Sequence, residues 1–420
     1  MDNPPPRIII RVMNADCDIL ISGGGLNGAT LALACAGAGR RVVLVDSQPV
    51  AARSDPAFDG RAYALALTSM RLLDGLGIWE SLDGNAQPML DIKVSDGRPG
   101  EGPSPFFMHF DHAEIEEGPM GYMVEDRHLR PALLAAVAAR SGIRHLAPET
   151  VIAQEPDATG ITVTLQSGER LRARLLVGCD GRDSQVAGRS GIARTGWGYE
   201  QTALVCAISH EKPHEGVAHQ FFMPEGPLAI LPLKGNRSSI VWTQGSRSAA
   251  HVAALPDPDY LDLLRPRFGD FLGEIGLEGK RSSYPLSLSL ANSLVADRVA
   301  LAGDAAHGVH PIAGQGLNAG LRDIAALAEV IADAARRGED FGATDVLARY
   351  EIWRRFDNTT LAIATDTFNR LFSNDNPLLR AGRDLGLGLV AKWPGLRRGF
   401  IREAAGLTGD LPRLMQGLPL

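Results

Sequence analysis

The sequence predicts an α/β protein with a discontinuous parallel-sheet domain, an inserted antiparallel sheet and helices at the C-terminus. Two widely separated stretches, 18–37 and 299–337, each read as an apolar strand, a glycine-rich turn and an Ala/Leu-rich helix. Between them lie alternating or continuous apolar runs separated by turn residues, a pattern typical of antiparallel strands. The chain thus leaves a first strand–turn–helix unit for antiparallel strands and returns to a second such unit near residue 299.

Length and composition are those of a globular enzyme. The chain has 420 residues, of which 45% are hydrophobic and 22% charged, enough for one large or two to three ordinary domains. Its net charge of -7 argues against general binding to nucleic acid. The cysteines are scattered without a CxxC pair, so we expect reduced core thiols in a cytosolic protein. No apolar run approaches the roughly 18 residues of a membrane helix. Residues 1–14, with three consecutive prolines, are expected to be a flexible tail.

The first motif is a nucleotide-binding fingerprint. An apolar strand is followed by GGGLNG at 23–28, a small-residue helix and a second strand that ends at Asp46. Gly23 permits a tight turn, Gly25 lets the backbone approach a pyrophosphate, and Gly28 lets the helix pack against the strand. Asp46 suits the hydroxyls of an adenosine ribose and would repel a 2′-phosphate. This βαβ unit predicts a Rossmann-like site for FAD or NAD rather than NADP.

Two further turns carry an acid at the end of a strand. In GDAAHGVHPIAGQGLNAG, at 303–320, Asp304 ends an apolar strand and the glycine turn at 314–316 opens a long helix. GCDGRDS, at 178–184, repeats the strand-end acid with Asp180. A helix N-terminus offers free N–H groups and about half a positive charge. That arrangement suits a carboxylate on a ribose-type hydroxyl and backbone donors facing an electron-rich ring.

Two arginines near predicted helix entrances are candidate cofactor contacts. Arg61, in DGRAYALAL, is placed to reach a phosphate or a flavin edge, or else is an exposed helix charge. Arg127 lies close to the start of the helix that follows YMVEDRHL. A cation there opposes the helix dipole, so we expect an anionic partner. That partner is either a cofactor phosphate or an acidic side chain in a surface salt bridge.

The order and wide spacing of the three motifs resemble the group A flavin monooxygenases of the para-hydroxybenzoate hydroxylase type, over about residues 16–375. HPIAGQGLNAGLRDIAALAEVI, DGRAYALALTS and FFMPEGPLAILPL resemble, more narrowly, the ubiquinone-biosynthesis hydroxylases, which act on a polyprenylated phenol. The resemblance implies a discontinuous Rossmann-like FAD domain, a substrate domain built on an antiparallel sheet, and C-terminal helices. The expected ranges are 1–14 for the tail, 15–80, 111–190 and 291–340 for the FAD-binding domain, 81–110 and 191–290 for the substrate domain, and 341–420 for the helices.

The resemblance also implies roles for individual residues. Backbone N–H groups of Gly316 and Leu317 are candidates for stabilising negative charge on the flavin. His310, near that turn, is a candidate for positioning flavin or substrate, although a structural histidine is commoner than a general base. The apolar Phe221, Met223 and Leu231 are candidate substrate contacts in a long channel between the flavin and the antiparallel sheet. The expected FAD contacts are Gly23, Gly25, Gly28 and Arg127 at the phosphates, Asp46 at the adenosine ribose, Arg61 at a phosphate or flavin edge, Gly303 and Asp304 at the ribityl chain or pyrophosphate, Asp180 at FAD and NAD(P)H, and Gly314, Gln315, Gly316, Leu317 and Asn318 at the isoalloxazine.

The activity that the resemblance implies is hydroxylation of the ring of a polyprenyl phenol in ubiquinone biosynthesis. The reaction would run through a flavin C4a-hydroperoxide and would use FAD, O2 and NAD(P)H or another electron donor. A hydroxylase of small soluble aromatics and an isoprenoid-reducing flavoenzyme on the same fold are alternatives. A flavin-binding interaction protein without turnover is a further alternative, which the complete glycine turn at 314–316 disfavours. The sequence shows no Ser-His-Asp or metal-ligand constellation.

The C-terminal stretch bears on where the protein works. It is either a membrane-surface anchor or a helix packed on the main body. We expect a mainly soluble, cytoplasmic protein with a lipophilic substrate and no nucleic-acid partner. Weak, salt-sensitive association with the inner face of the membrane or with a ubiquinone-biosynthesis complex is also expected. The aromatic and aliphatic positions of the stretch are Trp393, Leu396, Phe400 and Ile401, and the basic ones are Lys392, Arg397, Arg398 and Arg402.

Overall fold

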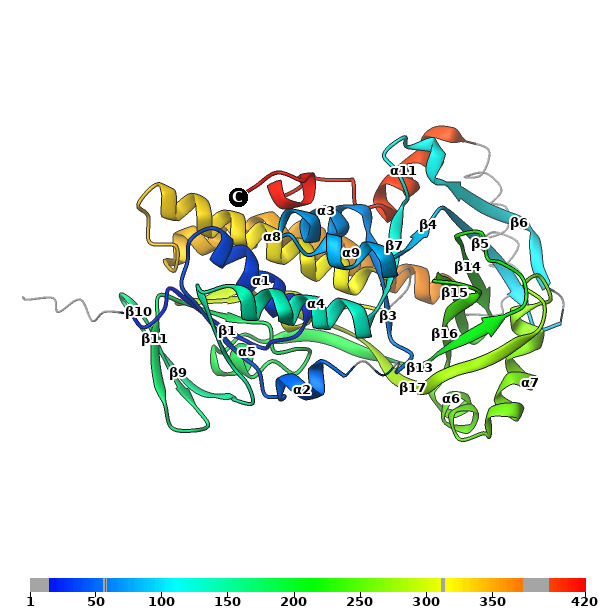
Figure 1. Cartoon of the computed structure of the whole chain (residues 1–420), viewed down its shortest axis with the longest axis horizontal. Coiled ribbons are helices and arrows are strands. Elements are labelled where there is room, and N and C mark those ends of the chain that lie inside the picture. The colour runs from blue at the N-terminus through cyan, green and yellow to red at the C-terminus, as the bar shows by residue number, and fades with distance from the viewer. Residues whose placement is uncertain (1–14, 56, 58, 101, 311–313, 373–392) are drawn as a thin grey trace, which may run out of the picture.

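A computed structural model of the chain describes residues 15–55, 57, 59–100, 102–310, 314–372 and 393–420 (Figure 1). The expected tail at 1–14 and Lys392 lie outside these residues. A parallel sheet occupies one end of the molecule and a large antiparallel sheet the other, and long helices run along one side (Figure 1). The predicted fold class is therefore confirmed. The predicted domain boundaries stay a prediction.

The parallel part is a six-stranded sheet with the order β18-β19-β12-β1-β2-β8. Every neighbouring pair is parallel except β18 with β19. All residues of its central strands are buried, as expected for strands that are covered on both faces. The strands are β1 (Ile19–Ser22), β2 (Val42–Val45), β8 (Ile143–Leu146), β12 (Leu175–Gly178), β18 (Val295–Ala296) and β19 (Val299–Leu301).

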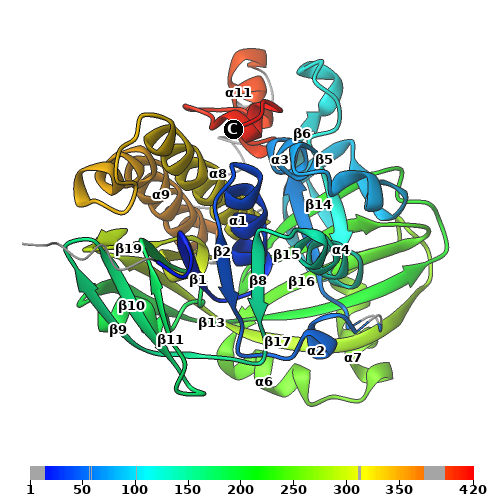
Figure 2. The ribbon, with the colours of Figure 1, turned by 60° about the vertical axis from the view of Figure 1, so that its left-hand side comes forward.

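Helices cover one face of this sheet and a three-stranded antiparallel sheet covers the other (Figure 2). Small and branched apolar side chains from all three layers form the main core. The helices are α1 (Leu26–Gly37), α4 (Asp126–Ala139), α8 (Gln315–Arg336) and α9 (Thr344–Phe372), and the three-stranded sheet is β9 (Val151–Asp157), β10 (Gly160–Leu165) and β11 (Arg170–Ala173).

The antiparallel part is an eight-stranded sheet with the order β20-β17-β13-β16-β15-β14-β5-β6. Its neighbours are antiparallel except for β14 with β5. The two 17-residue strands β13 and β17 run from this sheet back towards the parallel part (Figure 1). The strands are β5 (Asp91–Arg98), β6 (Gly102–Asp111), β13 (Arg194–His210), β14 (Val217–Met223), β15 (Gly226–Leu233), β16 (Arg237–Gly245), β17 (Ile275–Ala291) and β20 (His307–Gly308).

Shorter elements close the two faces of the antiparallel sheet. Helices α6 and α7 pack on one face through an apolar cluster that includes Trp242 and Tyr260. A small sheet of the order β3-β7-β4 lies on the other face. Helix α11 packs against β6 through the buried Ile401. These elements are α6 (Ser246–Ala253), α7 (Asp257–Phe268), β3 (Ala62–Ala66), β4 (Gln87–Met89), β7 (Gly121–Glu125), α11 (Pro394–Ala404), and, elsewhere, α2 (Val50–Arg53), α3 (Leu67–Gly75) and α5 (Gln185–Arg189).

Candidate active site

The three sequence motifs meet at one edge of the parallel sheet. In the register, Ser22 of β1 pairs with Val45 of β2 and Gly178 of β12, and Gly178 pairs with Leu301 of β19. Since parallel strands end at the same edge, the turns that follow these strands lie side by side. The crevice at the carboxyl ends of such strands is the usual ligand site of open α/β sheets.

The first glycine turn is shaped by close backbone approach. Gly23 has a φ of +107°, and a Cβ there would lie 2.3 Å from the carbonyl oxygen of Cys179. A Cβ on Gly28 would lie 1.8 Å from the carbonyl oxygen of Gly23. By contrast, a Cβ on Gly25 would meet nothing within 4 Å. Among the described residues no side chain caps the start of α1. Its N–H groups therefore border open space, which fits the pyrophosphate of a dinucleotide.

Asp46 lies beside this turn, as predicted, but its charge is partly balanced. The carboxylate is 3% exposed. Its Oδ1 accepts from Nη2 of Arg53 at 3.0 Å and from the amide of Gln48 at 2.9 Å. Arg53, in α2, has no motif that marks it in the sequence. Because Arg53 offsets the acid, Asp46 alone is a weaker bar to a 2′-phosphate than the sequence suggests.

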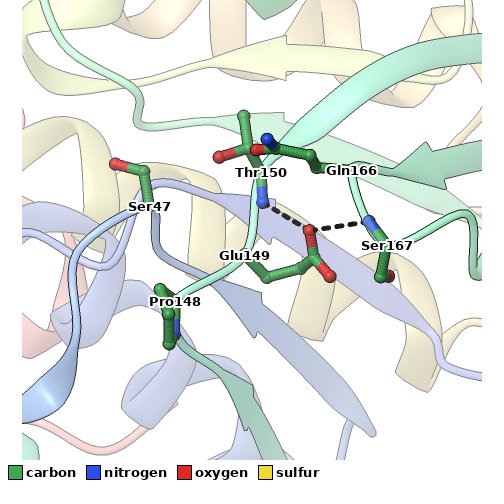
Figure 3. Close-up of a pocket in the computed structure, with 6 residues that line it drawn as sticks. All are labelled: Ser47, Pro148, Glu149, Thr150, Gln166 and Ser167. Carbon is green, nitrogen blue, oxygen red and sulfur yellow. Dashed lines mark hydrogen bonds between the residues drawn. The ribbon is translucent and has the colours of Figure 1, made fainter.

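A hollow of about 380 Å³ opens next to the end of β2 (Figure 3). Glu149 crosses it and accepts from the amides of Thr150 at 2.9 Å and Ser167 at 3.4 Å. The amide of Glu149 also donates to the carbonyl of Asp46 at 2.8 Å. The hollow thus adjoins the predicted ribose position, yet none of the predicted site residues lines it. The residues that line it are Ser47, Pro148, Glu149, Thr150, Gln166 and Ser167.

The two candidate arginines, Arg61 and Arg127, form ion pairs within the protein. Arg61 lies 2.6 Å from Asp59 and 3.2 Å from Asp126. Nε of Arg127 lies 2.6 Å from the buried carboxylate of Glu125. The anionic partner expected for Arg127 therefore includes an acidic side chain. Contact of either arginine with a cofactor phosphate stays a prediction.

Asp180, in the second motif, organises its own loop. One carboxylate oxygen accepts from the hydroxyl of Ser184, and the other accepts from the amides of Gln185 at 2.9 Å and Val186 at 3.1 Å. These bonds satisfy free donors at the start of α5. The side chain thus shapes the turn between β12 and α5, and its direct contact with FAD or NAD(P)H stays a prediction.

The third motif presents an acid at the edge of the sheet. The side chain of Asp304 is 46% exposed and lies 3.6 Å from Nε of Arg182. Arg194, at the start of β13, donates to the carbonyls of Asp304 at 3.3 Å and of Ala305. The position of Asp304 fits a hydroxyl-binding role. Arg182 and Arg194 were not predicted as site residues, because only tertiary contacts bring them to Asp304.

The glycine turn before α8 fits backbone recognition of a ring. Gly314 has a left-handed φ of +65°, and a Cβ on Gly316 would meet nothing within 4 Å. No side chain of the described residues caps this helix start. Gln315, Gly316 and Leu317 form the first turn of α8. The backbone N–H groups of Gly316 and Leu317 lie in this uncapped first turn, where they can donate to an electron-rich group, which is the predicted flavin contact.

Asn318 anchors this turn to the rest of the protein. Its Oδ1 accepts from the amide of Ala66 and the hydroxyl of Ser69, both at 2.8 Å. Its Nδ2 donates to the carbonyls of Ala64 at 2.8 Å and Gly314 at 3.2 Å. The side chain is thus used to hold α8 against β3 and α3. Only the backbone of Asn318 therefore remains for the predicted contact with the isoalloxazine, and that contact stays a prediction.

His310 is fully buried and uncharged at neutral pH. Burial lowers its pKa to about 4, and Arg182 acts in the same direction. Its ring packs edge to face with Tyr199 at 5.2 Å between centroids. Within the described part of the chain neither ring nitrogen has a hydrogen-bond partner. A neutral imidazole with unused nitrogens can accept a proton or hydrogen-bond a ligand, so the predicted role of His310 stays open.

The predicted substrate residues divide between two faces of the antiparallel sheet. Phe221 and Met223 point to the core beneath α6 and α7. Leu231 lies on the opposite face, near Ala62 and Ala64 of β3. Successive residues of a strand face opposite sides of the sheet. Phe221 pairs with Leu228 and shares its face, whereas Leu231, three positions after Leu228, lies on the other face. Phe221 and Met223 therefore belong to a structural core on the far side from the glycine turn, and only Leu231 is on the near side.

Comparison with known proteins identifies the class. Residues 16–356 match the family described as FAD binding domain. The fold is similar to that of p-nitrophenol 4-monooxygenase PnpA from Pseudomonas putida DLL-E4, with a TM-score of 0.76, 22% identity, and coverage of 94% of this chain and 98% of that one. Together with the glycine turns and strand-end acids, the family match defines an FAD-binding protein, and the structural likeness shows that it shares the fold of that enzyme.

The sequence relatives narrow the class. The chain is 48% identical to ubiquinone hydroxylase UbiL of Rhodospirillum rubrum over 406 residues, covering 96% of this chain and 93% of the relative. It is 33% identical to 3-demethoxyubiquinol 3-hydroxylase of Escherichia coli, covering 94% of this chain and 100% of the relative. The chain belongs to the family of FAD-dependent ubiquinone hydroxylases, and its predicted cofactor, FAD, is confirmed.

Replacing Asp304 tests the predicted role of this acid, at the carboxyl edge of the parallel sheet, in FAD binding. We expect Asp304→Ala to weaken FAD binding by about 1.5–3 kcal/mol, because a charge-assisted hydrogen bond is lost. Titration of apoprotein with FAD, followed by flavin fluorescence, measures the change. Asp297→Ala is the matched control, since Asp297 is exposed at the amino end of β19. Equal affinities of Asp304→Ala and wild type would place the cofactor away from this acid.

The buried His310 makes stability depend on pH. Its pKa of about 4 lies below the ordinary 6.5, so the unfolded chain takes up a proton that the folded protein resists. Stability should therefore fall as pH drops from about 6.5 towards about 4. The urea midpoint of His310→Asn should fall less over this range than that of the wild type. The same change at His251, exposed on α6, should leave the wild-type slope, and an unaltered slope in His310→Asn would refute the assignment.

Proposed function

We propose that this monooxygenase hydroxylates the aromatic ring of a polyprenyl phenol in ubiquinone biosynthesis, with NAD(P)H or another electron donor and with O2 as co-substrate. The printed names of its relatives include ubiquinone hydroxylase and 3-demethoxyubiquinol 3-hydroxylase. The structural observation that carries the proposal is an apolar, incompletely covered face of the antiparallel sheet on the side of the glycine turn before α8.

Buried and half-buried residues alternate along the strands that form this face. Val205, Ala229, Leu231 and Val241 occupy the central strands β13, β15 and β16, yet each remains half-buried. Their neighbours on the other face, such as Ile230, are buried beneath α6 and α7. A central strand residue that keeps solvent contact implies space above it. Because the side chains around this space are apolar, it favours a lipophilic ring and tail over a small charged aromatic.

The same face lies close to the candidate flavin turn. A Cβ on Gly314 would be 3.1 Å from Cβ of Ala64, and Ala64 packs in the same cluster as Leu231. Bound FAD supplies the electron-transfer and dioxygen chemistry of the reaction. The protein's own contribution would be to orient the phenol with the sheet side chains and to exclude water. The N–H groups at the start of α8 would stabilise negative charge at the ring.

Helix α11 is the candidate for contact with a membrane surface. The helix packs on the main body through Ile401, as one of the two alternatives from the sequence expects. Trp393 (63% exposed), Leu396 and Phe400 are exposed, and they support the other alternative, a membrane-surface contact. Nε of Arg397 lies 2.7 Å from Glu114, and Arg402 lies 3.2 Å from Glu117. Two of the basic residues therefore hold the helix in place, and Lys392 lies outside the described residues.

A lipophilic substrate makes surface contact with a bilayer the simplest route of supply. None of the described helices is both long and apolar enough to cross a membrane. An interfacial helix with outward aromatic and aliphatic side chains binds reversibly at the headgroup boundary. We therefore propose peripheral association through α11, with Arg398 as the basic residue of the outward set. Association with a complex of biosynthetic proteins is the alternative outcome.

Replacing Leu231 tests the substrate face. We expect Leu231→Asn to raise the KM for a prenylated phenol by about tenfold, because burying an apolar tail against an amide loses roughly 1–2 kcal/mol. The affinity for FAD should not change. Ile230→Val, on the opposite face, is the matched control and should leave KM as in wild type. If an unprenylated phenol is turned over as efficiently as the prenylated one, a hydroxylase of small soluble aromatics becomes the better assignment.

Replacing the outward residues of α11 tests the membrane contact. Trp393→Ala/Leu396→Ser should reduce sedimentation with anionic liposomes, with unchanged FAD content. Loss of about 100 Å² or more of buried apolar area is enough to weaken an interfacial helix measurably. The control is Phe356→Ala, because Phe356 is 76% exposed on α9. Equal pelleting of the double variant and wild type would show that substrate arrives by another surface or partner.

A further inference from the structure

A buried ionic cluster lies directly behind the turn that presents Asp304. Asp323, in α8, is fully buried, and Arg354, in α9, is 1% exposed. Nε of Arg354 donates to Oδ1 of Asp323 at 2.9 Å. The amide of Asn358 donates to the same oxygen at 3.2 Å. The charge of Asp323 is therefore balanced inside the protein by residues from the neighbouring helix.

The other oxygen of Asp323 holds the turn itself. The backbone N–H of Gly303 donates to Oδ2 at 3.1 Å, and Nε2 of His307 lies 2.6 Å from the same oxygen. Burial by itself raises the pKa of Asp323, but His307 and Arg354 lower it to about 2. The group thus stays an ionised carboxylate that only accepts hydrogen bonds. Both of its oxygens are occupied by donors.

Contacts from two other sides also hold this turn. Gly303 has a φ of +64°, and a Cβ there would lie 2.2 Å from the side-chain nitrogen of Asn27 in α1. From the opposite side, Arg194 donates to the carbonyls of Asp304 and Ala305. Helices α1 and α8 and strand β13 therefore fix the backbone of the turn, and the Asp304 side chain is left facing outward.

From these contacts we propose that Asp323 is a positioning residue for FAD. Asp323 fixes the Gly303–Ala305 turn so that Asp304 stands ready for the cofactor, and Arg354 keeps Asp323 ionised in the core. The proposal rests on FAD as the cofactor and goes beyond the proposed ring hydroxylation, since it holds for any substrate. A buried ion pair seldom stabilises a fold more than apolar side chains of the same size would. Holding the turn gives these charges a function that apolar residues could not perform.

Two variants separate positioning from simple stability. Asp323→Asn removes the acceptor charge and leaves the buried Arg354 with Asp357 as its remaining ion-pair partner, so the apoprotein should melt at a lower temperature. Asp323→Asn/Arg354→Met removes both charges, so most of the lost melting temperature should return. Both variants should still bind FAD about tenfold or more weakly than wild type, because the Gly303 amide and His307 lack their carboxylate. The visible circular dichroism of the bound flavin should also change in both.

Asp333→Asn is the matched control. It makes the same chemical change on the same helix, at an acid paired with Arg336 and Arg413 away from the turn. Its FAD affinity and flavin spectrum should equal those of the wild type. Apoprotein melting, FAD titration and flavin dichroism are measured on the full chain for all variants.

Two results would overturn the proposal. One is recovery of wild-type FAD affinity by the double variant, which would make the cluster a stabilising element only. The other is a folded Asp323→Asn that binds FAD within about twofold of wild type. Asp304→Ala in the same titration identifies the cause of failure. If Asp304→Ala also binds FAD like the wild type, the turn itself lies outside the cofactor site. The proposed positioning role of Asp323 would then be wrong as well.

Discussion

Close approach of backbone segments at the carboxyl edge of the parallel sheet is the constraint on which the candidate site depends. Gly23 lies against the carbonyl of Cys179, Gly28 against the carbonyl of Gly23, and Gly303 against the side chain of Asn27. A Cβ at any of these glycines would come within 2.3 Å of another atom. The parallel order of β19, β12, β1 and β2 brings these turns together, and glycine lets them meet without a gap.

The same close packing also means that the charged side chains of the candidate site lie near one another and form ion pairs. Asp46, Arg61 and Arg127 each have a partner of opposite charge within the protein. Pairing avoids isolated buried charges, which are costly in a low-dielectric interior. It also reduces the net charge that side chains present to a ligand. Much of the attraction for an anionic dinucleotide is therefore expected from uncapped N–H groups at the starts of α1 and α8.

The long strands of the antiparallel sheet connect the edge that carries the candidate FAD site with the proposed substrate face. Arg194, at the start of β13, holds the turn that carries Asp304. Farther along the same strand, Val205 lies beside the half-covered face that includes Leu231. His307, in the short edge strand β20, pairs with β17 and also contacts Asp323. The same sheet therefore contributes residues both to the turn that carries Asp304 and to the proposed substrate face.

The sequence by itself determined the fold class and the backbone part of the site. Glycine spacing, strand-end acids and helical periodicity are local properties, so Gly23, Gly25, Gly28 and Asp304 were placed at strand ends without a structure, and their contact with FAD stays a prediction. The open space beside Gly25 agrees with the role predicted for it. The resemblance of the three motifs to flavin hydroxylases carried the prediction of cofactor and family, which the comparisons confirm.

Only the tertiary structure decided which charges are paired and which way strand side chains face. Arg194 and Asp304 are 110 positions apart, and Arg354 and Asp323 are 31 apart, so no local pattern relates them. Phe221 and Leu231 are both apolar strand residues, yet strand pairing sends them to opposite faces of one sheet. The pairing of charges and the face of the sheet on which a strand side chain lies both depend on contacts between distant segments. Composition and periodicity could therefore place these residues in elements, but packing alone gave them their neighbours.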